Sequence, residues 1–424
     1  MIEKKEQYIG APENGIRLIT VTDPKFKKTS VTIHFIFPMD KDTASADSYP
    51  AYIIEDTNSD YPRMDKFFGR LSELYGASVS TSNSQMGDYR TMVVSGSVIS
   101  DKYALEGEHL AEELAKVMTS CIFRPVLEDG LFPQKQFDLK KNEFADDIIT
   151  EINEKRSYAI KKAKAAAFCG EPCAAPMKGE LESAKALSRE DALAAYKKIL
   201  RTASVDIFYC GSEISEDALR VLRDSFTGLE REDVCRFERT PSPLKPEPGY
   251  TEETMDIVQS KMVMAFKHDS HTPEEVRRLF VAIYGNSPFS LLFKNVREKL
   301  SLCYYCSLVP FSSKSAMFVD SGLEAANAET AQKEILNQLE VMKAGTFPDE
   351  MLEQAKLATL TSLKAVTDFP GSITSWYFDR LYSDSKVSPE EFAELVKAVT
   401  KEQIVEFANS LHLDTVYLLK GAQS

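Results

Sequence analysis

The sequence lacks any long hydrophobic run. No apolar stretch approaches the roughly 20 residues that a membrane-spanning helix needs, so we expect no membrane segment. The first ten residues, MIEKKEQYIG, carry charges but no apolar centre, so no secretory signal peptide is expected. The seven cysteines are an odd number in a long chain, which does not suggest a disulfide framework. These features together favour a cytoplasmic protein.

Positive charge is also in deficit. The chain has 51 lysine and arginine residues against 65 aspartate and glutamate residues, a formal net charge of −14. The phosphate backbone of a nucleic acid would be repelled by such a chain, so no nucleic-acid partner is expected. One local run is basic: Lys155, Arg156, Lys161, Lys162 and Lys164. A charge run of this kind predicts a solvated helix face.

Two cysteine pairs have spacings that occur in metal or redox sites. Cys303 and Cys306 lie in a stretch with strand character, where positions i and i+3 point to opposite faces. Cys169 and Cys173 lie in a turn that has no second pair. We therefore expect neither pair to bind a ligand and interpret the cysteines as small buried hydrophobic residues.

Histidine is scarce, with five residues in 424. His34 lies on an alternating strand, residues 30–37, opposite the face of Val31, Ile33, Phe35 and Phe37, and is expected to be a satisfied structural histidine. His109 opens an amphipathic helix and is expected to be solvated. His268 and His271 flank a short loop without a third ligand nearby, so the sequence predicts no metal site in this chain.

Periodicity and turn residues predict an α+β chain. Strands are expected at 15–21, 30–37, 77–83, 89–95 and 205–211, and helices at 64–75, through much of 103–200, at 215–226 and at 274–284. Ser188 with Asp191 suggests a capping box, and Gly76 a helix stop. Residues 237–254 hold four prolines, which predicts an extended, semi-rigid linker.

The second half of the chain repeats the first. The helix and strand of residues 187–211 resemble those of residues 399–421, each strand closing on a glycine, and the helix at 110–118 has a counterpart at 331–342. We therefore expect two homologous α+β domains, each a mostly antiparallel sheet flanked by helices, at 1–236 and 255–424. A turn is expected at 368–371, and Trp376 is expected to anchor the second core.

The most informative stretch is Gly285 to Tyr305, GNSPFSLLFKNVREKLSLCYY. Gly, Asn, Ser and Pro at its start are typical of a turn and a helix start. Leu292, Phe293, Val296 and Leu300 then recur at helical spacing and predict an inward stripe. Aromatic and branched residues at 303–309 predict a strand.

Two polar residues of this stretch lie seven apart. Arg297 falls in the last turns of the predicted helix and Tyr304 at the start of the strand. A guanidinium and a phenol at these places can converge on a backbone carbonyl or a carboxylate. Spacing alone leaves an alternative open, in which Arg297 pairs with Glu298 or another surface acid and Tyr304 belongs to the core.

The stretch resembles the signature of the C-terminal domain in the pitrilysin/insulinase peptidases, the inverted zincins. The resemblance implies two insulinase-like domains and assigns substrate binding to an arginine and a tyrosine seven residues apart, which bind peptide backbone near the scissile bond. Arg297 and Tyr304 match both positions. The family also adds substrate backbone to a sheet edge, which corresponds here to the predicted strand at 77–83.

The zinc motif of the family, H-x-x-E-H, has no counterpart in the chain. It would fall within residues 42–62, with ligands near Asp47 and Ala51 and the general base near Pro50. The segment His109-Leu-Ala-Glu-Glu113 begins like the motif but ends in glutamate. The resemblance therefore implies no cofactor in this chain, with zinc expected in a partner.

Three functional hypotheses follow from the resemblance. In the first, the chain is the non-catalytic subunit of a heterodimer, completing the chamber of a zinc-bearing paralogous partner and binding peptide substrate within a heteromeric zinc metalloendopeptidase. In the second, it is a stand-alone peptide-binding or scaffold protein. In the third, least favoured, it is an active hydrolase with a metal site rebuilt from His268, His271 and nearby acids.

Overall fold

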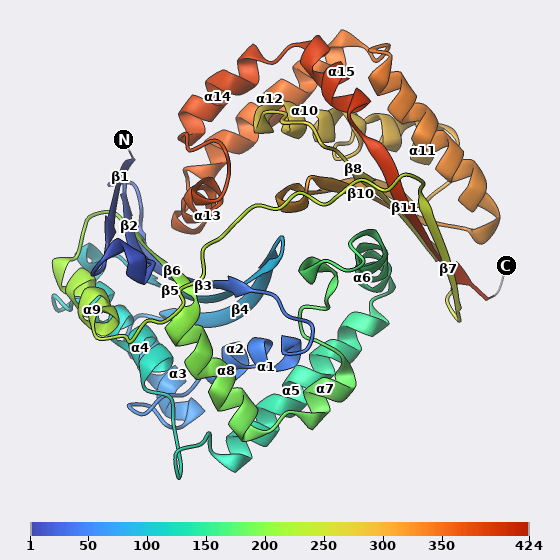
Figure 1. Ribbon diagram of the computed structural model, residues 1–424. Helices are drawn as coiled ribbons and strands as arrows, with labels where there is room; N and C mark the ends of the chain where they lie inside the picture. The colour runs from blue at the N-terminus through green and yellow to red at the C-terminus, as the bar shows by residue number, and fades with distance from the viewer. Residues whose placement is uncertain (1, 423–424) are drawn as a thin grey trace. The chain divides into compact units, whose positions relative to one another are not determined.

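The structure, a computed structural model, describes residues 2–422 and contains two β-sheets with helices packed on them (Figure 1). The strands are β1 (Glu3–Tyr8), β2 (Ile16–Thr22), β3 (Lys28–Pro38), β4 (Ser78–Met86), β5 (Tyr89–Ile99), β6 (Ser204–Gly211), β7 (Gly249–Met255), β8 (Ser260–Lys267), β9 (Tyr305–Phe311), β10 (Ala316–Leu323) and β11 (His412–Gly421). The predicted α+β class is confirmed.

The helices fall between and after the strands. They are α1 (Ala44–Ser48), α2 (Pro50–Ile53), α3 (Met64–Glu73), α4 (Leu110–Phe123), α5 (Gln134–Asn153), α6 (Lys155–Ala167), α7 (Leu181–Ala186), α8 (Arg189–Thr202), α9 (Glu216–Thr227), α10 (Glu274–Tyr284), the π-helix η4 (Leu292–Lys299), α11 (Ala328–Lys343), α12 (Asp349–Val366), α13 (Pro370–Leu381), α14 (Pro389–Ala398) and α15 (Lys401–Asn409). Short 3₁₀ turns are η1 (Pro12–Asn14), η2 (Asp101–Tyr103), η3 (Pro172–Ala174), η5 (Ser312–Lys314) and η6 (Ala325–Asn327). Within residues 2–422, no helix combines the length and the apolarity that crossing a bilayer requires.

The first sheet has the strand order β1-β2-β6-β3-β5-β4, with β2 and β6 parallel and the other pairs antiparallel. Helix α4 packs on β5 and α8 on β3. The apolar face predicted for β3 is buried, since the side chains on it are all at most 2% exposed: Val31, Ile33, Phe35 and Phe37. His34 and Ile36 on the other side of the strand are buried as well, so β3 is covered on both faces.

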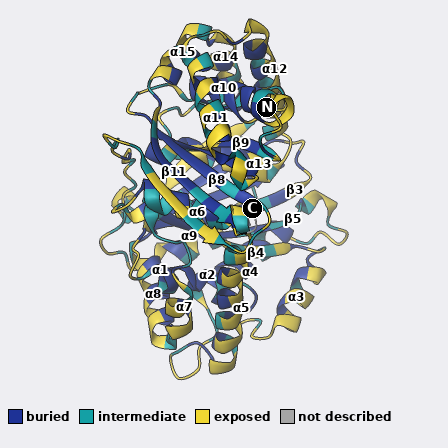
Figure 2. Cartoon of the chain, turned by 90° about the vertical axis from the view of Figure 1, so that its right-hand side faces the viewer, coloured by how far each residue is buried: buried dark blue, intermediate teal, exposed yellow. Residues whose placement is uncertain are grey.

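The second sheet has the order β7-β11-β8-β10-β9, with β7 and β11 parallel. Helix α6 lies against β8 and β11, and its alanines enter one core cluster with side chains of the sheet; the cluster includes Ala159, Ala163, Val263, Ala265, Tyr417 and Leu419. Figure 2 shows the central strand β8 as mostly buried. The small alanine side chains let α6 approach the sheet closely.

The two sheets repeat one topology. Five strands of the first sheet match five of the second in chain order and in their order across the sheet, and each set contains one parallel pair. The first set is β2 to β6, and the second set is β7 to β11. Only β1 has no counterpart in this comparison of described strands. The helix–strand units 187–211 and 399–421, which the sequence predicts to be equivalent, provide β6 and β11 at matching places.

Part of the predicted linker is a strand. Residues 237–248 have no regular secondary structure, whereas residues 249–254 belong to β7, which pairs with β11. The segment GYTEETM lacks apolar alternation, because β7 is an edge strand with mostly exposed side chains, and its sequence therefore does not predict a strand. Its equivalence to β2 identifies it as a true element of the second domain.

The division into units is not contiguous along the chain. One unit holds the residues up to 149 together with 175–238 and 367–379, and the other holds 150–174, 239–366 and the residues from 380 onward. Trp376 is buried but belongs to the segment that groups with the first unit, so its predicted role in the second core is wrong. In the same segment, Phe378 stacks on His34, with ring centroids 3.8 Å apart.

Candidate functional site

The helix of the Gly285–Tyr305 stretch is a π-helix, η4. Its wider turn is closed by bonds such as that from the Leu300 amide to the Asn295 carbonyl, 3.2 Å. Leu292 and Val296 are fully buried, as the helical spacing predicts. Leu300 is 45% exposed, which corrects the predicted stripe, because a π-helix turns less per residue and rotates later positions off the inward face. Single π-helical turns frequently occur at functional sites.

Arg297 lies in the last turn of η4 and lines a pocket of about 440 Å³. Its guanidinium carbon is 4.6 Å from the centroid of the Phe293 ring, a cation–π contact. Among the described residues, no carboxylate pairs with this guanidinium and no hydrogen bond engages it. The alternative in which Arg297 is held by Glu298 or another surface acid is therefore not the arrangement found in the structure.

Tyr304 lies immediately before β9. Its amide donates to the Gly322 carbonyl at 2.7 Å, which fixes the backbone against β10, while its side chain is 57% exposed. The phenol donates to Glu324 Oε1 at 3.2 Å. Tyr304 is thus not a core residue, and its hydroxyl is at the surface. It is Tyr305, the next residue, that lines the pocket with Arg297.

A second arginine, which the sequence interpretation assigned to a solvated face, lines the same pocket. Arg156 of α6 forms an ion pair through Nε with Asp320, donates from Nη2 to Ser307 Oγ at 3.2 Å and stacks on Tyr305 at 4.5 Å from the ring centroid. Asp320 is fully buried, and burial raises its pKa whereas Arg156 opposes that shift. Arg156 is exposed, as the predicted solvated face requires, but its ion pair with a buried carboxylate was not predicted.

Lys164 departs from that prediction. Burial lowers its pKa to about 8, and its ammonium lies 4.7 Å from the centroid of the Phe311 ring. A side chain in this environment covers apolar surface with its stem and contacts an aromatic ring with its charge.

The thiols of Cys303 and Cys306 meet, contrary to the prediction that they point to opposite faces. Cys303 precedes β9, so the alternation of a strand does not apply to it. A hydrogen bond from Cys306 lowers the pKa of the Cys303 thiol, burial opposes this, and Arg297 lowers it further. The same bond and burial raise the pKa of Cys306. Both cysteines are free and buried.

The residues at the place of the family's zinc motif do not fit a zinc ion. They lie on α1 and α2, where Pro50 begins the second helix and, like Ala51, offers no ligand atom. Asp47 is buried and accepts a hydrogen bond from the Thr43 hydroxyl at 2.6 Å, with Lys198 Nζ at 3.7 Å. One carboxylate already in contact with a donor and a cation is not a zinc ligand set, so no catalytic step can be assigned to a metal held by these residues.

A buried cation occupies this region instead. Arg90 of β5 is 1% exposed and donates from Nη1 to the Ala44 carbonyl at 3.1 Å and to Ser48 Oγ. Burial lowers its pKa to about 10, and the nearby Asp47 opposes that shift. The guanidinium ties α1 to the first sheet, and its positive charge would repel a metal cation placed beside it.

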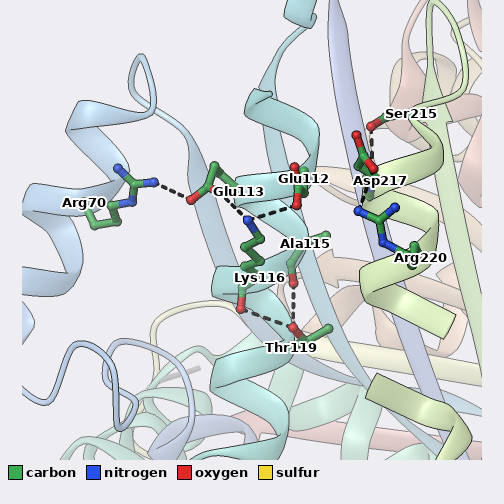
Figure 3. A network of polar contacts seen from close by, with 10 residues as sticks. Arg70, Glu112, Glu113, Ala115, Lys116, Thr119, Ser215, Asp217 and Arg220 are labelled. Atoms are coloured by element: carbon green, nitrogen blue, oxygen red, sulfur yellow. Dashed lines mark hydrogen bonds and ion pairs between the residues drawn. The ribbon is translucent and has the colours of Figure 1, made fainter. Parts of the chain in front are cut away.

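A separate cluster of potential metal ligands lies elsewhere in the first unit, and both of its carboxylates already form ion pairs. Ligand atoms of His109, Glu112 and Asp217 lie within 4.8 Å of one another, at the start of α4 and of α9. Figure 3 shows what holds the acids: Glu112 is 3.0 Å from Lys116 Nζ, and Asp217 is 2.6 Å from an Arg220 nitrogen. A cation bound here would have to compete with both pairs. His109 is exposed, in keeping with the solvated residue that the sequence predicts.

His268 and His271 do not form a rebuilt metal site. His268 is 2% exposed, and its Nδ1 lies 3.2 Å from the Ser270 carbonyl; burial lowers its pKa to about 4. His271 is exposed. Neither belongs to a group of converging ligand atoms within residues 2–422. His34 also differs from the satisfied histidine expected, because neither ring nitrogen has a hydrogen-bond partner among the described residues.

Comparison with known proteins agrees with the motif and the duplicated fold. The family described as Peptidase M16 inactive domain matches residues 186–359. A protein of Bacillus subtilis (strain 168), "Probable inactive metalloprotease YmfF", is 23% identical over 412 residues, which cover 96% of each chain. The chain therefore resembles the peptidase M16 proteins in sequence and in fold. It is metalloprotease-like and lacks the zinc motif of those peptidases.

Further proteins similar to this chain differ in how much of it they cover. An "Uncharacterized zinc protease" of Rickettsia bellii is 21% identical over 314 residues, 71% of this chain and 73% of that protein. A conserved protein from Enterococcus faecalis has a similar structure, with a TM-score of 0.91 and 23% identity over 99% of both chains. The peptidase M16 inactive domain from Pseudomonas fluorescens gives 0.81 at 15% identity, covering 100% of this chain and 98% of that one. These likenesses show the fold.

Proposed function

We propose that this chain is an M16-like protein and the peptide-binding, non-catalytic subunit of a heteromeric zinc peptidase, in which a paralogous partner carries the zinc. The observation that supports this most strongly is an asymmetry. Arg297 lies beside a pocket with no ionic partner among the described residues, and Tyr304 presents its hydroxyl at the surface, whereas Asp47, Pro50 and Ala51 cannot hold a metal.

The chemistry of the two side chains suits a peptide. Arg297 has donors that a peptide carbonyl, or the oxyanion formed from it, can accept, and the phenol of Tyr304 can donate once it leaves Glu324. The adjacent strand β9 is an edge of its sheet, and in the described part of the chain no strand pairs with its outer side. An extended peptide can add to such an edge through backbone hydrogen bonds.

The names of the relatives are compatible with this role. The Bacillus subtilis relative is described as a probable inactive metalloprotease and the Rickettsia bellii relative as a zinc protease. A family that includes both kinds of protein can supply both halves of the proposed complex, the zinc-bearing subunit and the subunit without zinc.

The proposal is tested by reconstitution with a zinc-bearing M16 chain from the same source and assay of peptide cleavage. We expect Arg297→Ala to lower kcat/KM by about tenfold to 100-fold, the range for loss of a donor to a carbonyl or oxyanion. Tyr304→Phe, which removes only the hydroxyl, should lower it by less. Lys294→Ala is the matched control, because Lys294 is an exposed cation of the same π-helix outside the pocket lining.

Cleavage that is equal for the wild type and Arg297→Ala, with both proteins folded by thermal melting, would refute the proposed role of Arg297. The alternative function is a stand-alone peptide binder or scaffold, favoured by the fact that the open edge of β9 needs no second subunit to pair with a peptide. Peptide binding by the isolated chain, combined with no effect of this chain on the partner's activity, would select that alternative.

A further inference from the structure

The pocket beside Arg297 carries positive charge, although the chain as a whole has a net charge of −14. The charged residues of its lining are Arg156 and Arg297, and no carboxylate is among the lining residues. The remaining lining side chains that matter here are polar or aromatic: Asn286, Ser287, Phe293, Tyr305 and Ser307. The pocket is therefore a locally basic site on an acidic protein.

The positive charges of the two arginines are balanced to different extents by their neighbours. Arg156 is held by the fully buried Asp320, by Ser307 and by the ring of Tyr305, so its plane is fixed. Asp320 balances that charge from a position outside the pocket lining. Arg297 contacts the face of Phe293, which contributes no negative charge, and lies near the Cys303 thiol, but it has no carboxylate partner among the described residues. The pocket therefore has a net charge of about one positive unit, together with donors from two guanidinium groups.

The arrangement of donors favours a planar monoanion. The Arg297 guanidinium can donate two parallel hydrogen bonds to a carboxylate, the geometry in which such pairs are strongest. Among the described residues, Arg156 uses Nε and Nη2 for its hydrogen bonds to Asp320 and Ser307. Its Nη1 is therefore left to donate to a ligand, and these contacts hold the guanidinium in one orientation. A volume of about 440 Å³ admits a short acidic side chain or a chain terminus, together with water.

We propose that this pocket binds a carboxylate of the peptide that the chain recognises, with Arg297 as the direct partner and Arg156 as the second, preoriented cation. The inference rests on the proposed function, since it assigns a preference to the same peptide-binding unit. The carboxylate can come from an aspartate or glutamate side chain or from the peptide's C-terminus. These two sources share one chemistry and are separated by the experiment.

The test uses the full chain and octapeptides labelled on a lysine side chain with an uncharged boron-dipyrromethene dye, in a fluorescence-polarisation assay. In one arm, N-acetylated and C-amidated peptides carry either Glu or Gln at each position in turn. In the other arm, neutral peptides carry a free or an amidated C-terminus. We expect one of these carboxylates to improve affinity by about tenfold or more, as a charge-assisted pair does, and the advantage to shrink at high salt.

The advantage should vanish in Arg297→Gln, which removes no structural hydrogen bond found among the described residues, and persist in Lys294→Gln. Replacement of Arg156 by a neutral residue would leave Asp320 buried and unpaired, so the second variant is Arg156→Lys, which keeps the charge but loses the planar fork. It should reduce the advantage several-fold while retaining the wild-type melting temperature to within a few degrees.

Each outcome is decisive. A Glu-over-Gln preference assigns the pocket to an acidic side chain, and a preference for the free C-terminus assigns it to a chain end. Equal binding of acidic and neutral peptides, still dependent on Arg297, would overturn the carboxylate assignment and leave the proposed function intact. No binding of any peptide, with no effect of Arg297→Ala on the partner's cleavage, would overturn both.

Discussion

His34 should make the first unit sensitive to mild acid. The imidazole lies in β3, stacks on Phe378 at 3.8 Å with the rings 13° from parallel and meets the edge of Phe208 at 5.9 Å. Burial lowers its pKa from 6.5 to about 3. Between these values the unfolded chain binds a proton that the folded chain does not, so stability is complete above pH 6.5 and falls as the pH drops toward 3.

The size of the effect follows from the pKa difference. A pH of 5 lies about 1.5 units below the pKa of the unfolded histidine, whereas the folded histidine is still neutral at this pH. At about 1.4 kcal/mol per unit, the free energy of unfolding therefore falls by about 2 kcal/mol. His34→Phe removes the titration and keeps an aromatic ring between Phe208 and Phe378. The variant should therefore lose about 2 kcal/mol less than the wild type between pH 7 and pH 5.

Urea unfolding followed by tryptophan fluorescence measures this difference. Trp376 is the only tryptophan and belongs to the same unit as His34, so its signal reports the unfolding of that unit. Carboxylates contribute to acid sensitivity in both proteins and cancel in the comparison. His109→Gln is the control, because it replaces an exposed histidine of the same unit. An equal loss of stability for the wild type and His34→Phe would refute the reasoning.

Three further changes have defined outcomes. Lys140→Met leaves the buried Asp56 carboxylate without the ammonium that lies 2.7 Å away and should cost about 3 kcal/mol in urea unfolding; a loss below about 1 kcal/mol would contradict a structural pair. Gly322→Ala places a methyl group against the Tyr305 ring and should cost about 1–3 kcal/mol and weaken peptide binding, whereas Gly69→Ala, with open space around it, should do neither. Zinc chloride at roughly 50 μM should raise the melting temperature by less than about 1 °C, and a larger rise in calorimetry would reveal a metal site.

The regular parts of the fold are accessible from sequence because their patterns are local. The period of two in β3 and the capping box of α8, in which Ser188 and Asp191 bond each other's backbone, are determined within a few residues. The edge strand β7 is different. Its outward side chains carry no apolar alternation, and only its place beside β11, more than 150 residues away, makes it a strand.

The site could be predicted only in part for the same reason. Arg297 stands in a motif, and the structure places it at a pocket. Arg156 stands in a charge run that resembles a solvated face, and nothing near it in the sequence announces Asp320, to which it is joined across 164 residues. The exposure of Leu300 follows from a π-helix, which the helical spacing of apolar residues does not reveal. Tertiary contacts decided each of these positions.

The two units exchange segments along the chain, and this limits how the protein can be divided. A gene fragment beginning at the proline-rich segment would encode the second sheet without α6, and would expose the apolar faces of Val263, Ala265, Tyr417 and Leu419 to water. A fragment ending there would lack the segment that brings Phe378 onto His34. Neither half is a self-sufficient module, so recombination or truncation at the most obvious boundary should yield insoluble products rather than working domains.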